Sequence, residues 1–164
     1  MKKLICMIII TVFALASCKE TSDRYIDADP EDVIKAVYEA LDGSGVLDGY
    51  KTMLYDVTVN AENEDYFLGV RGVEYESAVA SEPDIQPCAY SFVAVKLREG
   101  VDYDAQRKLI EKNLNKSRWV CTSCEEALAV RYENYVAIIM CDKKAADAIE
   151  TAYLNYMEEN YGVR

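Results

Sequence analysis

The stretch that decides the fold is ALAVRYENYVAIIMC, residues 127–141. Two runs rich in β-branched and aromatic residues flank the polar pair Glu133-Asn134, which predicts two strands joined by a two-residue turn. The second run is apolar at every position, so we expect it to lie inside a sheet. A continuous helix over residues 125–140 is the competing interpretation, because Glu-Glu-Ala-Leu-Ala favours helix. If Tyr132 and Tyr135 face each other, one face carries Leu128, Val130, Ala137 and Ile139, and the other carries Ala129, Val136, Ile138 and Met140.

The same order of elements occurs earlier in the chain. Residues 73–79 alternate between apolar and polar types, and residues 91–97 form a second β-rich run. Residues 102–115 carry apolar positions at helical spacing. After the hairpin, Asp142 is placed to cap a last helix. Strand–strand–helix therefore occurs twice, and we expect an α+β fold, an antiparallel sheet of about four strands with the helices on one face.

An additional helix precedes this repeat. Asp29 and Pro30 are typical of a helix start, since Asp is a favoured cap and Pro is tolerated in the first turn. Gly43-Ser44-Gly45 predicts its end. Residues 53–60 favour a short strand, and residues 60–68 a weaker helix.

The first eighteen residues are typical of an export leader. Met1-Lys2-Lys3 is basic, and residues 4–15 form an apolar run too short to span a membrane. The end of the leader, Leu15-Ala16-Ser17-Cys18, resembles the lipobox of bacterial lipoproteins. That resemblance implies cleavage of residues 1–17 and a lipid, palmitate included, on Cys18. An ordinary secretory leader and an uncleaved anchor are the alternatives.

The predicted location is therefore the cell membrane, lipid-anchored and facing outside the cytoplasm. We expect residues 18–28 to form the lipidated cysteine and a polar tether, and residues 29–160 a single domain. The net charge of −11 is repelled by anionic head groups, so the domain should stand off the bilayer. The same charge argues against a nucleic-acid partner, which needs a basic face.

Beyond the leader, several segments resemble an uncharacterised family of small bacterial lipoproteins classed as a domain of unknown function. They are the helix start at residues 29–34, the strands at residues 76–79 and 90–100, and the helix at residues 142–148. The resemblance implies a lipid-anchored domain outside the cytoplasm. It brings no catalytic residues.

The chain contains no histidine, which excludes Ser-His-Asp triads, Cys-His dyads and His-ligated metal sites. Four cysteines follow Cys18, and Cys121 and Cys124 have the C-x-x-C spacing of redox and zinc sites. That pair precedes a predicted hairpin rather than opening a helix, so structural disulfides or inert thiols are favoured. In the hairpin register, Cys124 lies diagonally from Cys141, at a separation that permits a disulfide. Cys88 and Cys121 would then pair with each other or stay free.

Three acidic clusters and thirteen tyrosines are the remaining candidates. The clusters at residues 27–32, 62–65 and 102–104 lack the glycine-containing calcium loop, and two coincide with helix starts that favour acids. No metal and no cofactor is therefore expected. Tyrosines could pack in the core or form a face for protein or carbohydrate, and Trp119 should pack at a helix end.

These patterns predict a non-enzymatic accessory or binding module with an unidentified protein or carbohydrate partner. No residue pattern singles out a catalytic residue. A small carboxylate-dependent hydrolase is the alternative, followed by a thiol redox lipoprotein that would use Cys121.

Overall fold

The computed structural model describes residues 23–50, 52–84 and 88–162. The predicted leader and the predicted lipid site at Cys18 lie outside these residues. Within the described part, the elements follow the order α1 (Pro30–Ala40), β1 (Leu54–Thr58), α2 (Glu64–Phe67), β2 (Tyr75–Pro83), β3 (Ser91–Leu97), α3 (Tyr103–Asn113), β4 (Glu126–Tyr132), β5 (Tyr135–Cys141) and α4 (Lys143–Tyr161). This is the expected α+β class, with strand–strand–helix occurring twice.

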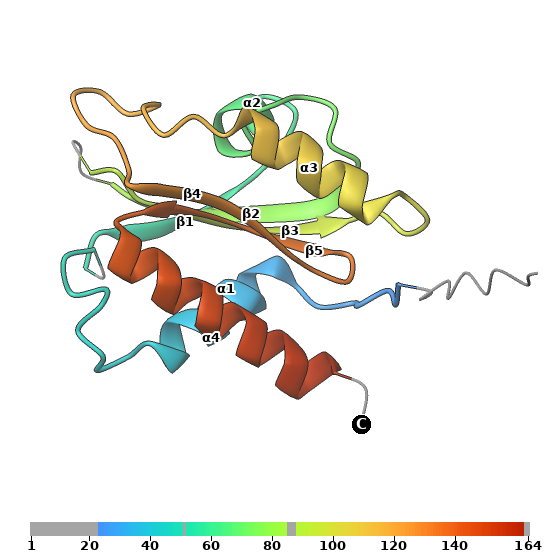
Figure 1. Ribbon diagram of the computed structural model, residues 1–164, viewed down its shortest axis with the longest axis horizontal. Coiled ribbons are helices and arrows are strands. Elements are labelled where there is room, and N and C mark those ends of the chain that lie inside the picture. The colour runs from blue at the N-terminus through green and yellow to red at the C-terminus, as the bar shows by residue number, and fades with distance from the viewer. Residues whose placement is uncertain (1–22, 51, 85–87, 163–164) are drawn as a thin grey trace, which may run out of the picture.

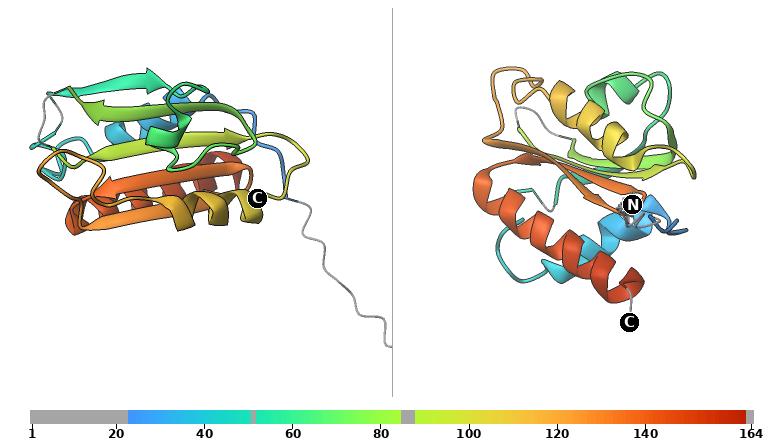
Figure 2. Two further views of the ribbon diagram at one scale, coloured as in Figure 1. Left: turned by 90° about the horizontal axis from the view of Figure 1, so that it is seen from above. Right: turned by 45° about the vertical axis from the view of Figure 1, so that its right-hand side comes forward.

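The described strands form one antiparallel sheet in the order β1-β2-β3-β5-β4 (Figure 2). The β4–β5 hairpin has the predicted register, with Tyr132 opposite Tyr135 and Glu126 opposite Cys141. Strand β5 lies between β3 and β4, as its apolar sequence predicts, and all seven of its residues are buried. The competing helix over residues 125–140 is therefore wrong.

The expected single helical layer is wrong, because helices cover both faces of the sheet. Helices α1 and α4 lie on one face and α2 and α3 on the other (Figures 1 and 2). The core is accordingly split into two clusters, with Ala137 and Ile139 of β5 in the first and Val136 and Ile138 in the second. The physical reason lies in β3 and β5, which are apolar on both faces and need cover on both.

The first half of the sheet differs from expectation in two further details. The described sheet has five strands rather than four, because β1 pairs with β2 along its full length. A register shift between Tyr75 and Ser77 interrupts the alternation expected over residues 73–79, and β2 continues to Pro83. The predicted weak helix over residues 60–68 is a single turn, α2.

Three predicted helix starts are confirmed by their capping hydrogen bonds. The side chain of Asp29 accepts from the backbone N–H of Glu31, and Asp102 and Asp142 each accept from the N–H three residues later. Each cap satisfies a donor that the first turn of a helix leaves without an intrahelical partner.

Residues 23–28, which we call the N-terminal strap, pack on the domain rather than forming a free tether. Ile26 is buried, and its backbone N–H and C=O bond the side chain of Asn134 at 2.7 and 3.1 Å. Asp27 accepts from Lys96 Nζ at 2.5 Å, and Tyr25 donates to Glu76. Within the described residues, the strap therefore packs as part of the folded unit, although the sequence predicts a polar tether over residues 18–28.

Candidate functional site

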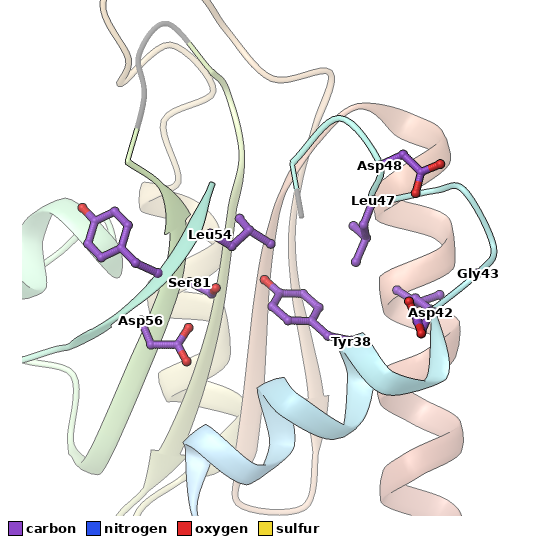
Figure 3. A pocket seen from close by; sticks show the side chains of 10 residues that line it. Tyr38, Asp42, Gly43, Leu47, Asp48, Leu54, Asp56 and Ser81 are labelled. Carbon is purple, nitrogen blue, oxygen red and sulfur yellow. The ribbon is translucent and has the colours of Figure 1, made fainter. Parts of the chain in front are cut away.

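One hollow of the described surface lies where β1 projects past the helical layer. Helix α1 packs mainly against β2 and β3, and β1 extends the sheet beyond these strands at its edge. The loop after α1 closes the other side of this space (Figure 3). The resulting pocket has a volume of about 460 Å³. Its apolar lining comes from Tyr38, Leu41, Leu47 and Leu54.

A second, more open pocket of about 740 Å³ adjoins the first along α1 and shares Tyr38, Asp42 and Asp56 with it. We call the two together the acidic groove. Lys35 is the one basic residue that lines it within the described part of the chain. The acidic residues that line it are Glu31, Asp32, Glu39, Asp42, Asp48 and Asp56.

A tyrosine network forms the inner wall of the groove. The ring of Tyr38 extends from α1 toward the strands (Figure 3), and its hydroxyl lies 3.0 Å from that of Tyr90. Tyr50 packs on Tyr90 with ring centroids 4.6 Å apart and donates to Asp142 at 2.9 Å. Burial raises the pKa of both Tyr38 and Tyr90 above the ordinary tyrosine value. Both phenols are therefore neutral at physiological pH and act as hydrogen-bonding groups rather than as anions.

Ser81 of β2 contributes a buried hydroxyl to the same wall. The residue has no exposed surface, and its Oγ lies near enough to the Tyr38 hydroxyl to lower the pKa of that phenol, but it makes no hydrogen bond of ordinary geometry within the described residues. Its side chain is directed toward the space between β1 and Tyr38 (Figure 3). Because a buried hydroxyl without a well-formed hydrogen bond is destabilising, a polar ligand group that bonded it would remove a cost already present in the fold.

The chemistry of the groove suits a cation that also has an apolar part. Carboxylates and hydroxyl oxygens accept hydrogen bonds from ammonium or guanidinium groups, and charge-assisted bonds of this kind are the stronger ones. The leucines of the pocket offer apolar contact to an aliphatic chain. The expected acidic cluster at residues 27–32 supplies two of the lining carboxylates, Glu31 and Asp32.

The other acidic clusters do not join the groove. Residues 62–65 and 102–104 do not line it; Asp102 caps α3, and Asp65 pairs with Arg71. Among the described residues, no group of three or more His, Cys, Asp or Glu side chains is arranged to hold a metal ion.

Sequence patterns missed most of the groove. Tyr38 lies inside the predicted first helix with no pattern that marks it as a site residue, and Asp42, Asp48, Asp56 and Ser81 belong to no motif. The one available signal was the alternation over residues 53–60, which places Asp56 on the same face as Leu54.

The two cysteines predicted to form a disulfide, Cys124 and Cys141, are not bonded to each other in this structure. Cys124 and Cys141 are free thiols, and they pack in the two clusters on opposite faces of the sheet. Strand β4 begins at Glu126, and the N–H of Cys124 instead bonds the C=O of Lys116, so the strand alternation does not extend to Cys124. Burial raises the pKa of both thiols, whereas a reactive redox cysteine has a lowered one.

The tyrosines and Trp119 have mainly packing roles outside the groove. Tyr153 is fully buried and Tyr156 half-buried on α4, and Trp119 is buried in the second cluster. Tyr132 and Tyr135 are opposite in register, but their hydroxyls bond Glu158 and the C=O of Ala28.

A buried ion pair lies on the other face of the sheet. Arg118 bonds Glu82, and its guanidinium stacks on Tyr66 and Trp119 at 4.4 and 4.7 Å from the ring centroids. Burial raises the pKa of Glu82, although Arg118 opposes that shift. The two charged groups bond each other. This cluster therefore connects α2 and the loop after α3 to the sheet, and it does not present an unpaired charge to a ligand.

No helix in the described part of the chain has the length and apolar character needed to cross a membrane. No family model, no curated protein and no solved structure matches the chain.

Proposed function

We propose that the chain is a lipid-anchored, non-enzymatic binding protein outside the cytoplasm, and that its acidic groove takes a cationic ligand. The observation that carries the ligand class is the lining of the groove, in which six carboxylates face one lysine. The lipobox-like leader supports the location.

The protonation states of the tyrosines at the groove favour binding over catalysis. The phenols of Tyr38 and Tyr90 have pKa values raised by burial, which makes them poor proton acceptors at neutral pH. A general acid–base pair needs two groups whose environments move their pKa values toward the working pH. Exposed carboxylates around an amphipathic pocket instead match the needs of cation binding.

Calorimetric titration of the full chain, kept in detergent, with spermine tests the ligand class. We expect wild-type protein to bind and Asp56→Asn to bind about tenfold more weakly, since one charge-assisted hydrogen bond contributes about 1.5 kcal/mol. Glu99→Gln is the matched control, because Glu99 is an exposed acid beyond the far end of β3. Binding that is absent, or equal in wild type and Asp56→Asn, would contradict the proposal.

The same variants separate the binding protein from a hydrolase. Turnover of glycosidic or phosphoester substrates that Asp56→Asn abolishes and Glu99→Gln preserves would favour the enzyme.

Replacing Cys18 with Ala tests the anchor. We expect the variant to leave the membrane fraction or to keep its leader. A variant that is processed at the normal position, takes up labelled palmitate and sediments with membranes would refute lipidation at Cys18.

A further inference from the structure

Strand β1 is an open edge of the sheet, directly above the acidic groove. Among the described residues it pairs only with β2, so the outward N–H and C=O groups of Leu54–Thr58 have no strand partner, although the C=O of Thr58 accepts from the side chain of Asn63 at 3.1 Å. Its sequence, Leu-Tyr-Asp-Val-Thr, contains no proline or lysine, and its ladder to β2 has no register shift. Natural edge strands commonly carry a proline, a lysine or a β-bulge, each of which hinders pairing with another chain.

The opposite edge strand, β4, is protected by comparison. Helix α3 packs over it (Figure 1). Arg131 of β4 forms ion pairs with Asp23 of the strap and Asp104 of α3, and Glu126 pairs with Lys116. Of the two edge strands of the described sheet, β1 is therefore the one that is accessible to a strand from another chain.

An added strand would direct part of its side chains into the groove. Side chains alternate between faces along a strand, and neighbours across a pair lie about 5 Å apart. Leu54 and Asp56 occupy the groove face of β1 (Figure 3). Residues of the added strand on that face would therefore meet Asp56, with Asp42 and Asp48 beyond it.

Resting on the proposed function, we infer that the cationic ligand is an extended basic segment of another protein, which adds as a strand to β1. A lysine or arginine side chain of that segment enters the pocket, its aliphatic stem along Leu47 and Leu54 and its charged end among the carboxylates. The buried Ser81 hydroxyl is an acceptor at the inner wall. A linear polyamine would match the carboxylates but would leave the backbone of β1 unpaired.

The position of the strap is consistent with a protein partner rather than a lipid one. The strap leaves the domain beside the β4–β5 turn (Figure 1). The pocket lies toward the other end of the sheet, because its residues Asp56 and Ser81 are in register with Ile139 near the end of β5. If Cys18 holds the lipid, the five residues up to Asp23 span at most about 17 Å. The β4–β5 turn then faces the bilayer, and the pocket is turned away from it.

Hydrogen exchange of the full chain in detergent tests the inference with three probes. The first is the acetylated, amidated peptide Lys-Val-Lys-Val-Lys-Val-Lys, the second is the same peptide N-methylated at every internal amide, and the third is spermine. We expect the first peptide alone to slow amide exchange in residues 54–58. Asp56→Asn should weaken its binding about tenfold, whereas Glu99→Gln should not.

The two proposals fail in different ways. Spermine binding with unchanged exchange in residues 54–58 under the first peptide would overturn strand addition and leave the cation site standing. Equal affinity of the peptide and its N-methylated form would do the same. Failure of both spermine and the peptide to bind would overturn both proposals.

Discussion

At the scale of single residues, Asn134 joins the strap to the sheet. Its side chain is fully buried and bonds both backbone groups of Ile26, 108 residues away in sequence. The preceding residue, Glu133, has φ of 50°, a left-handed conformation that costs a non-glycine residue about 1 kcal/mol. The tertiary contacts of Asn134 and Glu133 stabilise the turn in this conformation.

Asn134→Ala should therefore lower the free energy of unfolding by about 2–3 kcal/mol, because it leaves a buried N–H and C=O of Ile26 unpaired. Urea denaturation provides the measurement. Asn155→Ala, on the exposed side of α4, should change stability by less than about 0.5 kcal/mol. Equal effects of the two substitutions would mean that the strap does not depend on Asn134.

Glu76 should make the strap sensitive to acid. Its pKa is lowered by the hydrogen bond from Tyr25 and by the contact with Lys96. A carboxylate whose pKa is lower in the folded state contributes stability above its unfolded pKa of about 4.3 and loses it as pH falls further. The stability difference between wild type and Glu76→Gln, measured from pH 7 to pH 3, should be constant near neutrality and shrink below about pH 4. A difference that grows on acidification would have the wrong sign for this account.

What could be predicted at the residue scale was local. The caps Asp29, Asp102 and Asp142 act on backbone groups two or three residues away, so their neighbours in sequence reveal them. Asn134 and Ser81 owe their importance to distant segments. Nothing in their surrounding sequence indicates those segments.

At the scale of elements, the β4–β5 hairpin is both the best predicted part and the centre of the fold. Its register follows from a two-residue turn and from strands whose side chains alternate. The side of the sheet taken by each helix did not follow, because a helix after an antiparallel pair can return over either face. The two-sided apolar sequence of β5 indicated a second layer, since one helical layer would leave half of it exposed.

Ile139 of β5 tests the hairpin placement. Ile139→Asp should unfold the domain at neutral pH, because the new charge would be buried in the first core cluster without a partner. Val120→Asp, at an apolar residue with 76% exposure, should fold normally. Circular dichroism and thermal unfolding of the two variants make the comparison. A folded Ile139→Asp protein with wild-type stability would contradict the interior position of β5.

At the scale of the whole molecule, the strap packs against the domain and stabilises it. A chain starting at residue 29 loses the buried side chain of Ile26 and its two hydrogen bonds. We expect that chain to be less stable than a chain starting at residue 23, because the side chains of Asn134, Lys96 and Tyr135 each lose a hydrogen-bond partner. Urea denaturation of the two chains measures this difference. Equal stability of the two chains would mean that residues 23–28 do not stabilise the fold, as expected for a tether.

The acidic groove is a property of the whole molecule, because α1, the loop after it, β1 and β2 each contribute to it. Its carboxylates could be counted in the sequence, but their gathering depends on β1 projecting past α1. Sequence patterns therefore predicted a binding module without its site.

The central claim is that cations bind in this groove, and chemical-shift mapping of the isotope-labelled full chain in detergent with spermine tests it most directly. The account predicts that the largest backbone shifts fall at groove residues, among them Tyr38, Leu47, Leu54, Asp56 and Ser81, and diminish as salt is added. The largest shifts at the β4–β5 turn, or the absence of shifts at millimolar spermine, would contradict it.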